Sequence, residues 1–377
     1  MNILVANIGS TSFKYRLFRS GEVSAQGRIE RIGQPGGSCP DYETAIVQCA
    51  AEIGSLADLN GVGFKAVHAG PVGGARLIDD EVLNAMEDFA FHAPAHNPPY
   101  IAAMRSFRKA LPKVPLVALF ETAFFDELSA ATTTYAVPYE WMTELGIRRY
   151  GFHGASHRAA SERAIEILGR RDIRHISCHL GGSSSMAAIR GGVALDTTFG
   201  ISPQSGLPHN NRTGDLDVFA ALFAMKKLNL SVDEIANILA TKSGLAGISG
   251  TSGDVRDLEE GIARGDHRCR LAMDVFIDAI RRYLGDILVK LGGLDVLTFS
   301  GGIGENSAAI REGVCTNLEE FGITLDSARN GAAKGEATLS GDGSKVKILI
   351  VPADEERIVA RATAEVISKA QGGNDGR

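Results

Sequence analysis

The sequence lacks the features that mark several large classes of protein. No apolar run approaches the roughly 20 residues of a membrane-spanning helix, and the first residues enter a strand pattern without the basic and apolar regions of a signal peptide. Lysine and arginine number 39 against 45 aspartates and glutamates, which gives a formal net charge of -6. No basic stripe alternates with aromatic residues. We therefore expect no membrane and no nucleic acid among the partners.

Cysteine is also scarce, and its spacing excludes familiar sites. The five cysteines are odd in number and form no C-x-x-C pair; they are Cys39, Cys49, Cys178, Cys269 and Cys315. This pattern disfavours a disulfide framework and a cysteine metal site. We expect buried free thiols in a reducing compartment, the cytoplasm.

Nucleotide-binding signatures of the usual kinds are missing as well, although glycine is abundant, with 44 residues. No Gly-Lys-Ser/Thr of a Walker A loop follows any glycine-rich turn, and no G-x-G-x-x-G opens a βαβ unit. Two other turns stand out instead, residues 9–12 and residues 181–185, each rich in Gly and Ser between two strand patterns. Such a turn exposes N–H groups and hydroxyls that suit a phosphate, although ordinary hairpins use the same residues. Their repetition favours a duplicated fold that holds a polyphosphate from both sides.

A third glycine-rich segment lies near residue 300. Residues 294–299 read as a buried strand, and we expect residues 301–304 to turn sharply before a helix that carries Glu305 and Asn306. A strand, a glycine-rich turn and a helix N-terminus together favour a nucleotide site.

The length of 377 residues fits two domains of ordinary size. Strand and helix patterns alternate, which predicts an α/β class. We expect strands at residues 63–67, 116–120 and 347–351, and helices at residues 81–91, 156–168, 271–291 and 355–370. We expect the chain to leave its first domain near Val137-Pro138-Tyr139.

Four polar clusters fall in predicted loops, at residues 96–99, 148–154, 206–215 and 249–257. Each alone is equally well explained by structural hydrogen bonds and ion pairs. Taken in order, however, they belong to a series of motifs: N-x-G-S-x-S-x-K at 7–14, V-H-x-G at 67–70, A-P-x-H-N-P at 93–98, R-R-Y-G-F-H-G-x-S-H at 148–157, C-H-L-G at 178–181, G-L-P-x-x-x-R-x-G-D at 206–215, S-G-x-S-x-D-x-R-D at 249–257 and G-I-G-E-N-S at 302–307. Over nearly its whole length the chain resembles the acetate kinase family of the sugar kinase/Hsp70/actin superfamily.

The resemblance implies two ribonuclease H-like, actin/Hsp70-type ATPase domains with a nucleotide cleft between them. The first would span residues 1–145 with a returning C-terminal helix at about 356–377 and carry the acid pocket, and the second, 146–355, would bind the nucleotide. The implied activity is reversible, direct in-line phosphoryl transfer between ATP and acetate or a similar short-chain acid, giving acyl phosphate and ADP. Mg²⁺ or Mn²⁺ would assist, and the active form would be a homodimer.

The resemblance also implies roles for individual residues. Those expected to act in catalysis are Lys65, Glu121, His153 and Arg212. Those expected to bind the nucleotide are Asn7, Ser10, Ser12, Lys14, His179, Gly181, Gly182, Asp254, Arg256, Gly302, Ile303, Gly304 and Asn306. Those expected to line the acid pocket are Val67, Ala95, Phe152 and Pro203, and those expected near the metal are Glu355 and Asn7.

The chain departs from the family pattern at several of these positions. Lys65 stands for an arginine, Glu121 for an aspartate and Gly182 for an asparagine. Lysine keeps the charge but loses the planar fork that holds a carboxylate through two hydrogen bonds. We hypothesise that Lys65 and Glu121 compensate for one another. The sequence also has Ala95 where a larger residue is common, and His209-Asn210-Asn211 where Met-Gly-Thr is usual.

These departures leave alternatives open. The acid could be propionate or butyrate instead of acetate, and the phosphoryl donor could be pyrophosphate instead of ATP. A different class of function, a nucleotide-binding regulatory protein without catalysis, is the third reading. Retention of charge at two of the three altered positions favours catalysis.

Overall fold

The computed structural model describes the chain except residues 10, 36, 38, 55, 57 and 373–377. It divides into two compact units, one made of Met1–Asp126 with Asp354–Arg377 and the other of Glu127–Ala353. Each unit is built on its own six-stranded mixed sheet. Among the described residues, no helix combines the length and the apolar character that crossing a membrane requires.

The sheet of the first unit has the strand order β3-β2-β1-β4-β6-β5. Its strands are β1 (Asn2–Gly9), β2 (Ser12–Arg19), β3 (Glu22–Glu30), β4 (Gly61–Ala66), β5 (Ala75–Leu77) and β6 (Leu116–Phe120). Strands β1, β2 and β3 form an antiparallel meander, while β1, β4 and β6 run parallel. Residues Leu4–Ala6 are buried on both faces of β1, because helices cover both sides of a sheet that contains parallel strands.

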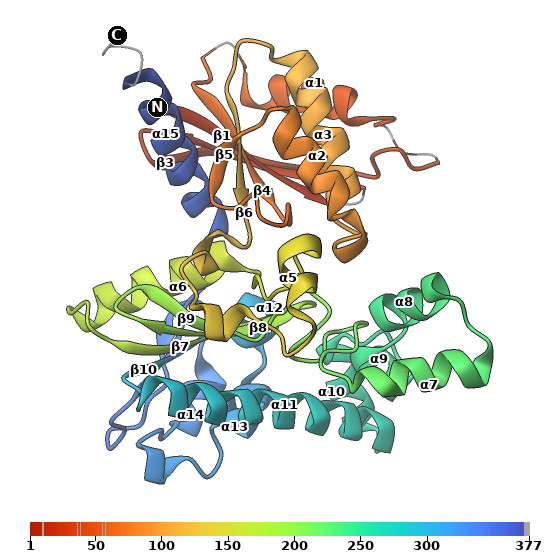
Figure 1. The fold of residues 1–377 in the computed structure, drawn as a ribbon. Helices are drawn as coiled ribbons and strands as arrows, with labels where there is room; N and C mark the ends of the chain where they lie inside the picture. Colours follow the sequence, from red (N-terminus) through yellow and green to blue (C-terminus); the bar gives the residue numbers. More distant parts are fainter. Residues whose placement is uncertain (10, 36, 38, 55, 57, 373–377) are drawn as a thin grey trace. The chain divides into compact units, whose positions relative to one another are not determined.

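Those covering helices come from distant parts of the sequence. Helices α1 (Tyr42–Ile53), α2 (Asp80–Asp88) and α3 (Asn97–Ala110) cover one face, and α15 (Glu355–Gly372), drawn in blue, covers the other (Figure 1). Helix α15 packs so closely that a Cβ on Gly63 of β4 would lie 2.9 Å from the Val359 side chain. The C-terminal helix is thus part of the first unit.

The second unit repeats this plan. Its strands are β7 (Arg174–Leu180), β8 (Ser184–Arg190), β9 (Val193–Thr197), β10 (Val296–Ser300), β11 (Ala337–Thr338) and β12 (Lys347–Ile350). The order is β11-β12-β10-β7-β8-β9, with β7, β8 and β9 antiparallel and β7, β10 and β12 parallel. Strand for strand this matches the first sheet, including a short antiparallel edge strand next to the last parallel one. The α/β class and the duplicated actin-type fold predicted from the sequence are confirmed.

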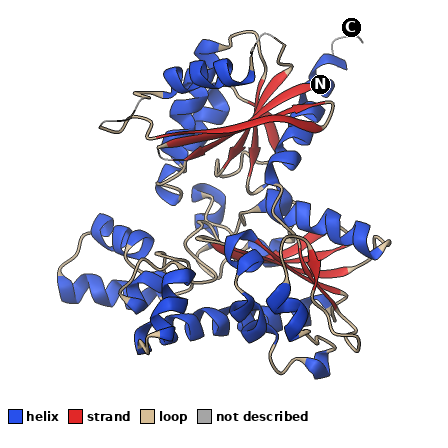
Figure 2. Cartoon of the chain, turned by 180° about the vertical axis from the view of Figure 1, so that it is seen from behind, coloured by secondary structure: helices blue, strands red, loops and turns tan. Residues whose placement is uncertain are grey.

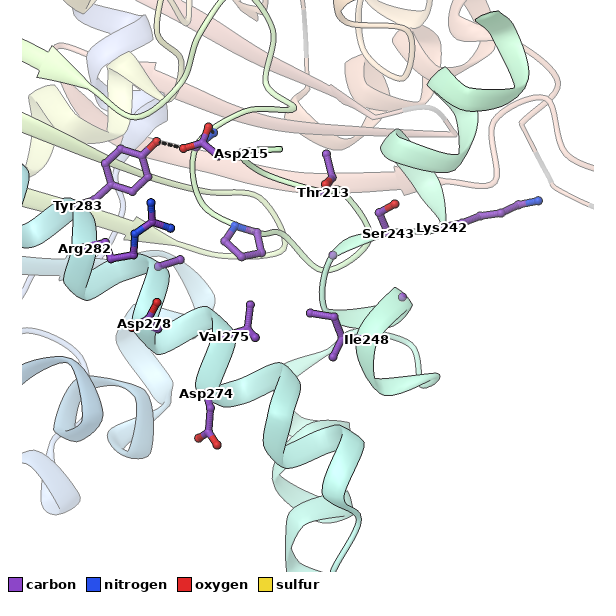
Figure 3. Close-up of a pocket in the computed structure, with 15 residues that line it drawn as sticks. Thr213, Asp215, Lys242, Ser243, Ile248, Asp274, Val275, Asp278, Arg282 and Tyr283 are labelled. Atoms are coloured by element: carbon purple, nitrogen blue, oxygen red, sulfur yellow. Dashed lines mark hydrogen bonds between the residues drawn. The ribbon is translucent and has the colours of Figure 1, made fainter. Parts of the chain in front are cut away.

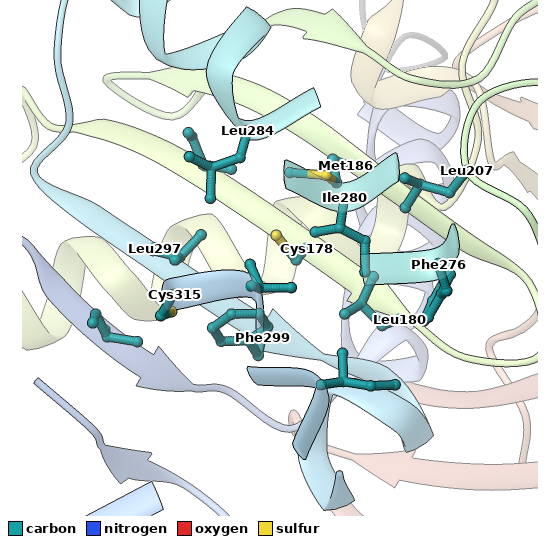
Figure 4. Close-up of a cluster of buried hydrophobic side chains, with 14 of the residues drawn as sticks. Cys178, Leu180, Met186, Leu207, Phe276, Ile280, Leu284, Leu297, Phe299 and Cys315 are labelled. Carbon is teal, nitrogen blue, oxygen red and sulfur yellow. The ribbon is translucent and has the colours of Figure 1, made fainter. Parts of the chain in front are cut away.

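The core of the second unit lies between its sheet and the long helix α11 (His267–Leu291). Phe276, Ile280 and Leu284 of α11 face Cys178 and Leu180 of β7 (Figure 4). On the opposite face, α6 (Gly154–Leu168) packs Ala160 and Ala164 against Val296 and Leu349. Figure 2 shows each red sheet with blue helices on both faces. All five cysteines are buried free thiols, as expected.

Shorter helices complete the chain. They are η1 (Ala90–His92), η2 (Ala123–Phe125), α4 (Ala130–Thr133), α5 (Tyr139–Leu145), α7 (Val218–Leu228), α8 (Val232–Thr241), α9 (Gly244–Ser249), α10 (Val255–Ala263), α12 (Gly301–Asn306), α13 (Ala308–Cys315), η3 (Glu319–Phe321) and α14 (Ser327–Ala332).

Two local expectations are wrong. Residues 301–304 were expected to form a turn, but they are the first residues of helix α12. The chain reverses at Gly301 alone, which has a φ of 76° and sits so near β7 that a Cβ would lie 2.6 Å from the Leu180 carbonyl oxygen. Residues 96–99 were expected to be a loop, yet α3 begins at Asn97, with prolines in its first turn, where the missing N–H costs nothing.

The unit boundary also lies earlier than residue 145. Residues 127–145 group with the second unit. The Arg149 N–H donates to the Thr133 carbonyl at 2.8 Å, and the Ile201 N–H donates to Tyr135 Oη at 3.0 Å. These pairings join segments that are far apart in the sequence, and no composition change marks them.

Candidate active site

The hairpin between β1 and β2 is the first of the two Gly/Ser turns. It pairs Gly9 with Ser12 and Asn7 with Lys14; Ser10 lies outside the described residues. Tyr100 of α3 holds the end of β1, because its Oη accepts from the Ile8 N–H at 3.1 Å and donates to Asn7 Oδ1 at 3.3 Å. Sequence reasoning did not single out Tyr100, whose only signal was a position just after the A-P-x-H-N-P motif.

A buried charged cluster lies at the ends of β4 and β6, beside the first residue of α15. Lys65 Nζ is 2.5 Å from Glu355 Oε2 and 3.5 Å from Glu121 Oε1. The exposed fractions of the three side chains are 18%, 12% and 4%, respectively. Burial opposes the charge on Lys65, but the two carboxylates outweigh it and hold the pKa of the ammonium well above its usual range. Lys65 therefore stays charged at neutral pH.

This geometry bears on the hypothesis that Lys65 and Glu121 form a compensating pair. They do contact one another, but Glu355 lies closer to the ammonium and makes the pair a triad. The sequence separates Glu355 from Lys65 by 290 positions, so only the return of α15 brings them together.

The oxygen atoms of this region suit a hard divalent cation. Asn7, Glu121 and Glu355 offer only oxygen donors, and Tyr100 interacts with both carboxylates and with Asn7. No group of three or more His, Cys, Asp or Glu side chains within the described part of the chain forms a metal cluster. Mg²⁺ in nucleotide enzymes usually takes one or two carboxylates and completes its shell with phosphate oxygens and water. The residues fit an ion of that kind.

The residues expected in the acid pocket are divided between the units. In the first unit, Val67 is buried and Ala95 is exposed. Asn97 ties their two segments together, because its amide donates to the His68 and Met86 carbonyls, both at 2.7 Å. In the second unit, Pro203 is buried, and Phe152 packs edge-on against Phe199 with 5.6 Å between ring centroids.

The second Gly/Ser turn joins β7 and β8. Leu180 pairs with Ser184, and the Gly181 N–H donates to Ser184 Oγ at 3.2 Å. The Ser184 N–H donates to Nδ1 of His209 at 2.9 Å. The turn is thus held by its own hydroxyl and by a buried imidazole from the loop at residues 206–215.

A cavity of about 640 Å³ opens beside this turn. It is lined by Gly181, Gly182, Asn210, Asp254, Val255, Arg256, Glu259, Gly302, Ile303, Asn306 and Ser307. Seven residues of that set were expected to bind the nucleotide. Gly304 is not one of the lining residues, because it is buried in α12 against Phe299. The volume suits a nucleotide-sized ligand.

Asp254 and Arg256 form the polar wall of this cavity. The Asp254 carboxylate caps α10 by accepting from the Arg256 N–H, and the two side chains form an ion pair at 2.6 Å. Hydrogen bonds from Arg256 lower the pKa of Asp254 to about 2. Arg256 itself is largely exposed.

Two imidazoles lie near the same turn. His153 has a left-handed backbone, with φ of 59°, at the start of α6, a strained conformation for a residue other than glycine. Its Nδ1 is 2.8 Å from Ser185 Oγ, and its ring centroid is 4.2 Å from that of His179. His179 Nδ1 is 2.7 Å from Ser156 Oγ. The structure thus brings His153 and His179 together.

Arg212 is mostly buried, and its guanidinium donates to the Pro203 carbonyl at 2.8 Å. Burial lowers the pKa of Arg212 to about 10, which leaves it charged at neutral pH. Its loop is closed by Asp215, which accepts from the Gly206 N–H at 2.8 Å and donates its own N–H to the Gly206 carbonyl at 2.9 Å. Tyr283 of α11 donates to the Asp215 carboxylate.

A second cavity, of about 700 Å³, adjoins the base of this loop. Pro208, Thr213 and Asp215 of the loop line it together with α9 and the polar side chains of α11 (Figure 3). None of the residues predicted to form the site lines this cavity. The smaller cavity, not this one, coincides with the expected nucleotide residues.

Comparisons with known proteins agree with these features. A family model described as the acetokinase family matches residues 37–361. The chain belongs to this family. An acetate kinase of Treponema denticola is 40% identical over 398 residues, covering 97% of this chain and 100% of that protein. An acetate kinase of Bacillus cytotoxicus is 39% identical, covering 95% and 97%.

Solved structures show the same relationship. An acetate kinase of Porphyromonas gingivalis superposes with a TM-score of 0.89 at 37% identity, covering 97% of this chain and 99% of that one. A propionate kinase of Francisella tularensis superposes with a TM-score of 0.90 at 30% identity and the same coverage. The resemblance drawn from the motifs is confirmed.

Proposed function

We propose that the chain transfers the terminal phosphoryl group of ATP to the carboxylate of acetate or a similar short acid, reversibly, giving an acyl phosphate and ADP. Membership of the acetokinase family supports this activity, as do relatives named acetate kinase that match nearly full length. The strongest structural support is a cavity lined by seven of the residues expected to bind nucleotide.

The chemistry needs positioning and charge neutralisation more than acid–base catalysis. A carboxylate is already a nucleophile, so no general base has to activate it. In the transition state of phosphoryl transfer, negative charge is spread over the oxygens of the transferring phosphoryl group. Arg212, charged and with one of its guanidinium nitrogens already fixed on Pro203, would neutralise that charge, and His153 would donate a hydrogen bond to it.

The first unit would supply the acid side of the reaction. Lys65 would attract the substrate carboxylate. Glu121 and Glu355 keep the Lys65 ammonium protonated, so that it can make this contact. Val67 and Ala95 of this unit would line the alkyl group of the acid. Because Ala95 is small, the pocket would also take propionate or butyrate; one methylene changes such a preference by only about 10–200-fold.

A divalent cation, Mg²⁺ or Mn²⁺, would be held by Glu355 and Asn7 with the nucleotide phosphates. When bound, it would neutralise phosphate charge. Glu121 would then balance the charge of Lys65.

ATP is favoured over pyrophosphate as the donor by the size of the smaller cavity. Its 640 Å³ would be far more than a pyrophosphate fills, and Gly302 leaves open space next to its backbone. The third reading, a nucleotide-binding protein without catalysis, is supported only by the altered residues Lys65, Glu121 and Gly182. Against it, Lys65 keeps its charge beside two buried carboxylates.

A homodimer in the cytoplasm completes the proposal. Helix α7 has no buried residue, and Val218, Phe219, Leu222 and Phe223 are each at least half exposed. An apolar patch of this kind on a helix suits contact with a second copy. Five free thiols suit a reducing compartment. Sedimentation of Phe219→Asp, expected to be monomeric where the parent is dimeric, tests the interface.

The activity itself is tested by trapping acyl phosphate as hydroxamate, with Mg-ATP and acetate, propionate or butyrate. Arg212→Ala should lower kcat by about 1,000-fold or more. Arg281→Ala is the matched control, because Arg281 also donates to backbone carbonyls, those of Gly313, Val314 and Thr316, away from the cavity. No product with any acid, while ATP still binds, would reject the carboxylate kinase.

A further inference from the structure

A chain of buried hydrogen bonds runs inward from His153. Ser185 Oγ is 2.8 Å from His153 Nδ1 and also 2.8 Å from His157 Nε2. On its other side, His157 Nδ1 is 2.9 Å from Ser177 Oγ. His157, Ser177 and Ser185 are all at most 1% exposed. We call Ser177, His157 and Ser185 the relay.

His157 is neutral within the relay. Burial lowers the pKa of its imidazole well below the usual range, and the nearby His179 and His175 lower it further. A neutral imidazole carries one N–H and one acceptor nitrogen. The hydrogen bonds of the relay can therefore have only two donor-to-acceptor orders, from Ser177 towards His153 or from His153 towards Ser177. Each order determines whether Nδ1 of His153 carries a proton.

Counting donors decides between the two directions. The Ser177 hydroxyl has a single hydrogen-bond partner among the described residues, His157 Nδ1. If that nitrogen carried the proton of His157, the Ser177 O–H would be a buried donor without an acceptor, which is strongly unfavourable. Ser177 therefore donates to Nδ1, the His157 proton sits on Nε2 and donates to Ser185, and Ser185 donates to His153 Nδ1.

We infer that the relay holds neutral His153 in the tautomer whose proton is on Nε2. The same count applies to His179: buried Ser156 has one partner among the described residues, His179 Nδ1, and must donate to it. Two adjacent rings are thus set as neutral N–H donors, which suit phosphoryl oxygens without the repulsion of two imidazolium ions. That use rests on the proposed function, whereas the tautomers do not. Ser177, His157 and Ser185 are positioning residues.

The tautomers can be read directly by two-bond ¹H–¹⁵N correlation spectra of the full chain with ¹⁵N-labelled histidine. His153 and His179 should each show a protonated Nε2 and an unprotonated Nδ1 near pH 7.5, assigned through His153→Gln and His179→Gln. A protonated Nδ1 on His153 would overturn the inference. This result does not depend on which substrate the enzyme uses, so it stays informative if no acid is turned over.

Kinetics with Ser185→Ala then test the consequence. The variant should show a mixture of His153 tautomers and a kcat lowered about 10-fold, with both KM values changed less than about twofold. Thr298→Val is the matched control: Thr298 Oγ1 lies 2.8 Å from Nε2 of His175, another buried histidine on β7, outside the relay. It should keep the parent kcat and the His153 spectrum even if it unfolds at a lower temperature.

A pair of changes at His157 separates the relay from simple packing. In His157→Gln the amide can donate to Ser185 and accept from Ser177, so kcat should fall less than about threefold. In His157→Met the volume is similar but the hydrogen bonds are lost, and kcat and the tautomer mixture should match Ser185→Ala. Equal kcat and equal spectra in the two variants would contradict the relay.

A separate observation concerns Asn210, which lines the smaller cavity beside the second turn. A Cβ built on Gly182 would lie 3.5 Å from Asn210 Nδ2, and the Asn210 N–H donates to the Gly182 carbonyl at 3.1 Å. Among the described residues, Nδ2 has no hydrogen-bond acceptor. The geometry points to Asn210 as a phosphate-binding residue, with its amide occupying the space next to the bare glycine. This role rests on the nucleotide site of the proposed function.

Moving the amide from one position to the other tests this assignment. Asn210→Gly should weaken ADP binding by at least about 10-fold in calorimetry, because a hydrogen bond to a charged group is lost. Adding Gly182→Asn should restore most of it, since the backbone at Gly182 does not need a positive φ. Unchanged binding in Asn210→Gly, or no restoration in the double variant, would remove Asn210 from the site. If neither variant nor parent binds ADP, the proposed function fails instead.

Discussion

The two units share one sheet topology but bury polar groups of different kinds. At the ends of β4 and β6, the first unit buries formal charges, with Lys65 between Glu121 and Glu355. Around β7 and β8, the second unit buries neutral groups, with His157, Ser177 and Ser185 in one hydrogen-bonded chain. Duplication therefore conserved the backbone plan and left the polar interior of each half to diverge.

The difference has an energetic meaning. A buried ion pair is costly to desolvate, and removal of one partner leaves a buried charge without compensation. A neutral hydrogen-bonded network avoids that cost, but every donor must find an acceptor. The first unit should thus be sensitive to removal of a charge and the second to removal of a hydroxyl or to added protons.

The largest effect of a single substitution is expected from breaking the charged cluster. Lys65→Met leaves two buried carboxylates without their cation and should lower the free energy of unfolding by about 3 kcal/mol. The control is Lys109→Met, since Lys109 pairs with Glu43 at 2.8 Å but is largely exposed, and its loss should cost less than about 1 kcal/mol. Urea unfolding at pH 7 measures both. Equal losses would mean that the cluster is as well hydrated as the surface pair.

The next effect separates the units by pH. Burial lowers the pKa values of His157 and His209 well below the usual range and that of His175 to about 3. Below about pH 6.5 these histidines bind protons in the unfolded chain but stay neutral in the folded unit. The free energy of unfolding that they contribute above that pH is therefore lost as the pH falls. The slope is up to about 1.4 kcal/mol per pH unit for each such histidine.

Urea unfolding between pH 7.5 and 5 tests this, monitored by Trp141, the single tryptophan, which lies in the second unit. His175→Gln should reduce the slope of the unfolding free energy against pH by the equivalent of about one proton. His267→Gln, at an exposed histidine, should leave this slope unchanged. Lys65 behaves in the opposite sense: its raised pKa gives stability that is present at neutral pH and lost only on strong alkalinisation. An unfolding free energy of the second unit that does not change between pH 7.5 and 5 would contradict the burial of neutral histidines there.

The smallest effect concerns the match between Lys65 and Glu121. Lys65→Arg and Glu121→Asp should be non-additive in kcat/KM for the acid, with a coupling of about 0.5 kcal/mol or more. The 3.5 Å contact is the reason. Additive single changes would show that each residue acts only through Glu355 or the substrate.

Local sequence signals are sufficient to predict several elements of the fold. The strand at residues 116–120 was predicted at its observed bounds, because five consecutive apolar residues between breakers are typical of a buried strand. Both Gly/Ser hairpins are present where the strand patterns placed them. Helices 156–168 and 271–291 were predicted slightly short at their N-termini.

Other features depend on neighbours that the local sequence does not reveal. Pro98 and Pro99 lie in the first turn of α3 instead of preventing the helix. Gly301–Gly304 belong to a helix whose first residue is a glycine in close contact with β7. The roles of Tyr100, Asn97 and Asn210 went unnoticed, because a single Tyr or Asn near a motif is an ordinary residue until its partners are known.

The sequence alone determined the class, the duplication and the family, because strand periodicity, glycine-rich turns and the order of the motifs are properties of the chain itself. Only the tertiary structure decided which side chains meet. Glu355 joins Lys65 across 290 positions because α15 returns to the first sheet. Ser177 meets His157 because α6 packs on β7. Charge balance and donor counts arise from these long-range contacts, since the energy of a buried polar group depends on its neighbours in space and not on those in sequence.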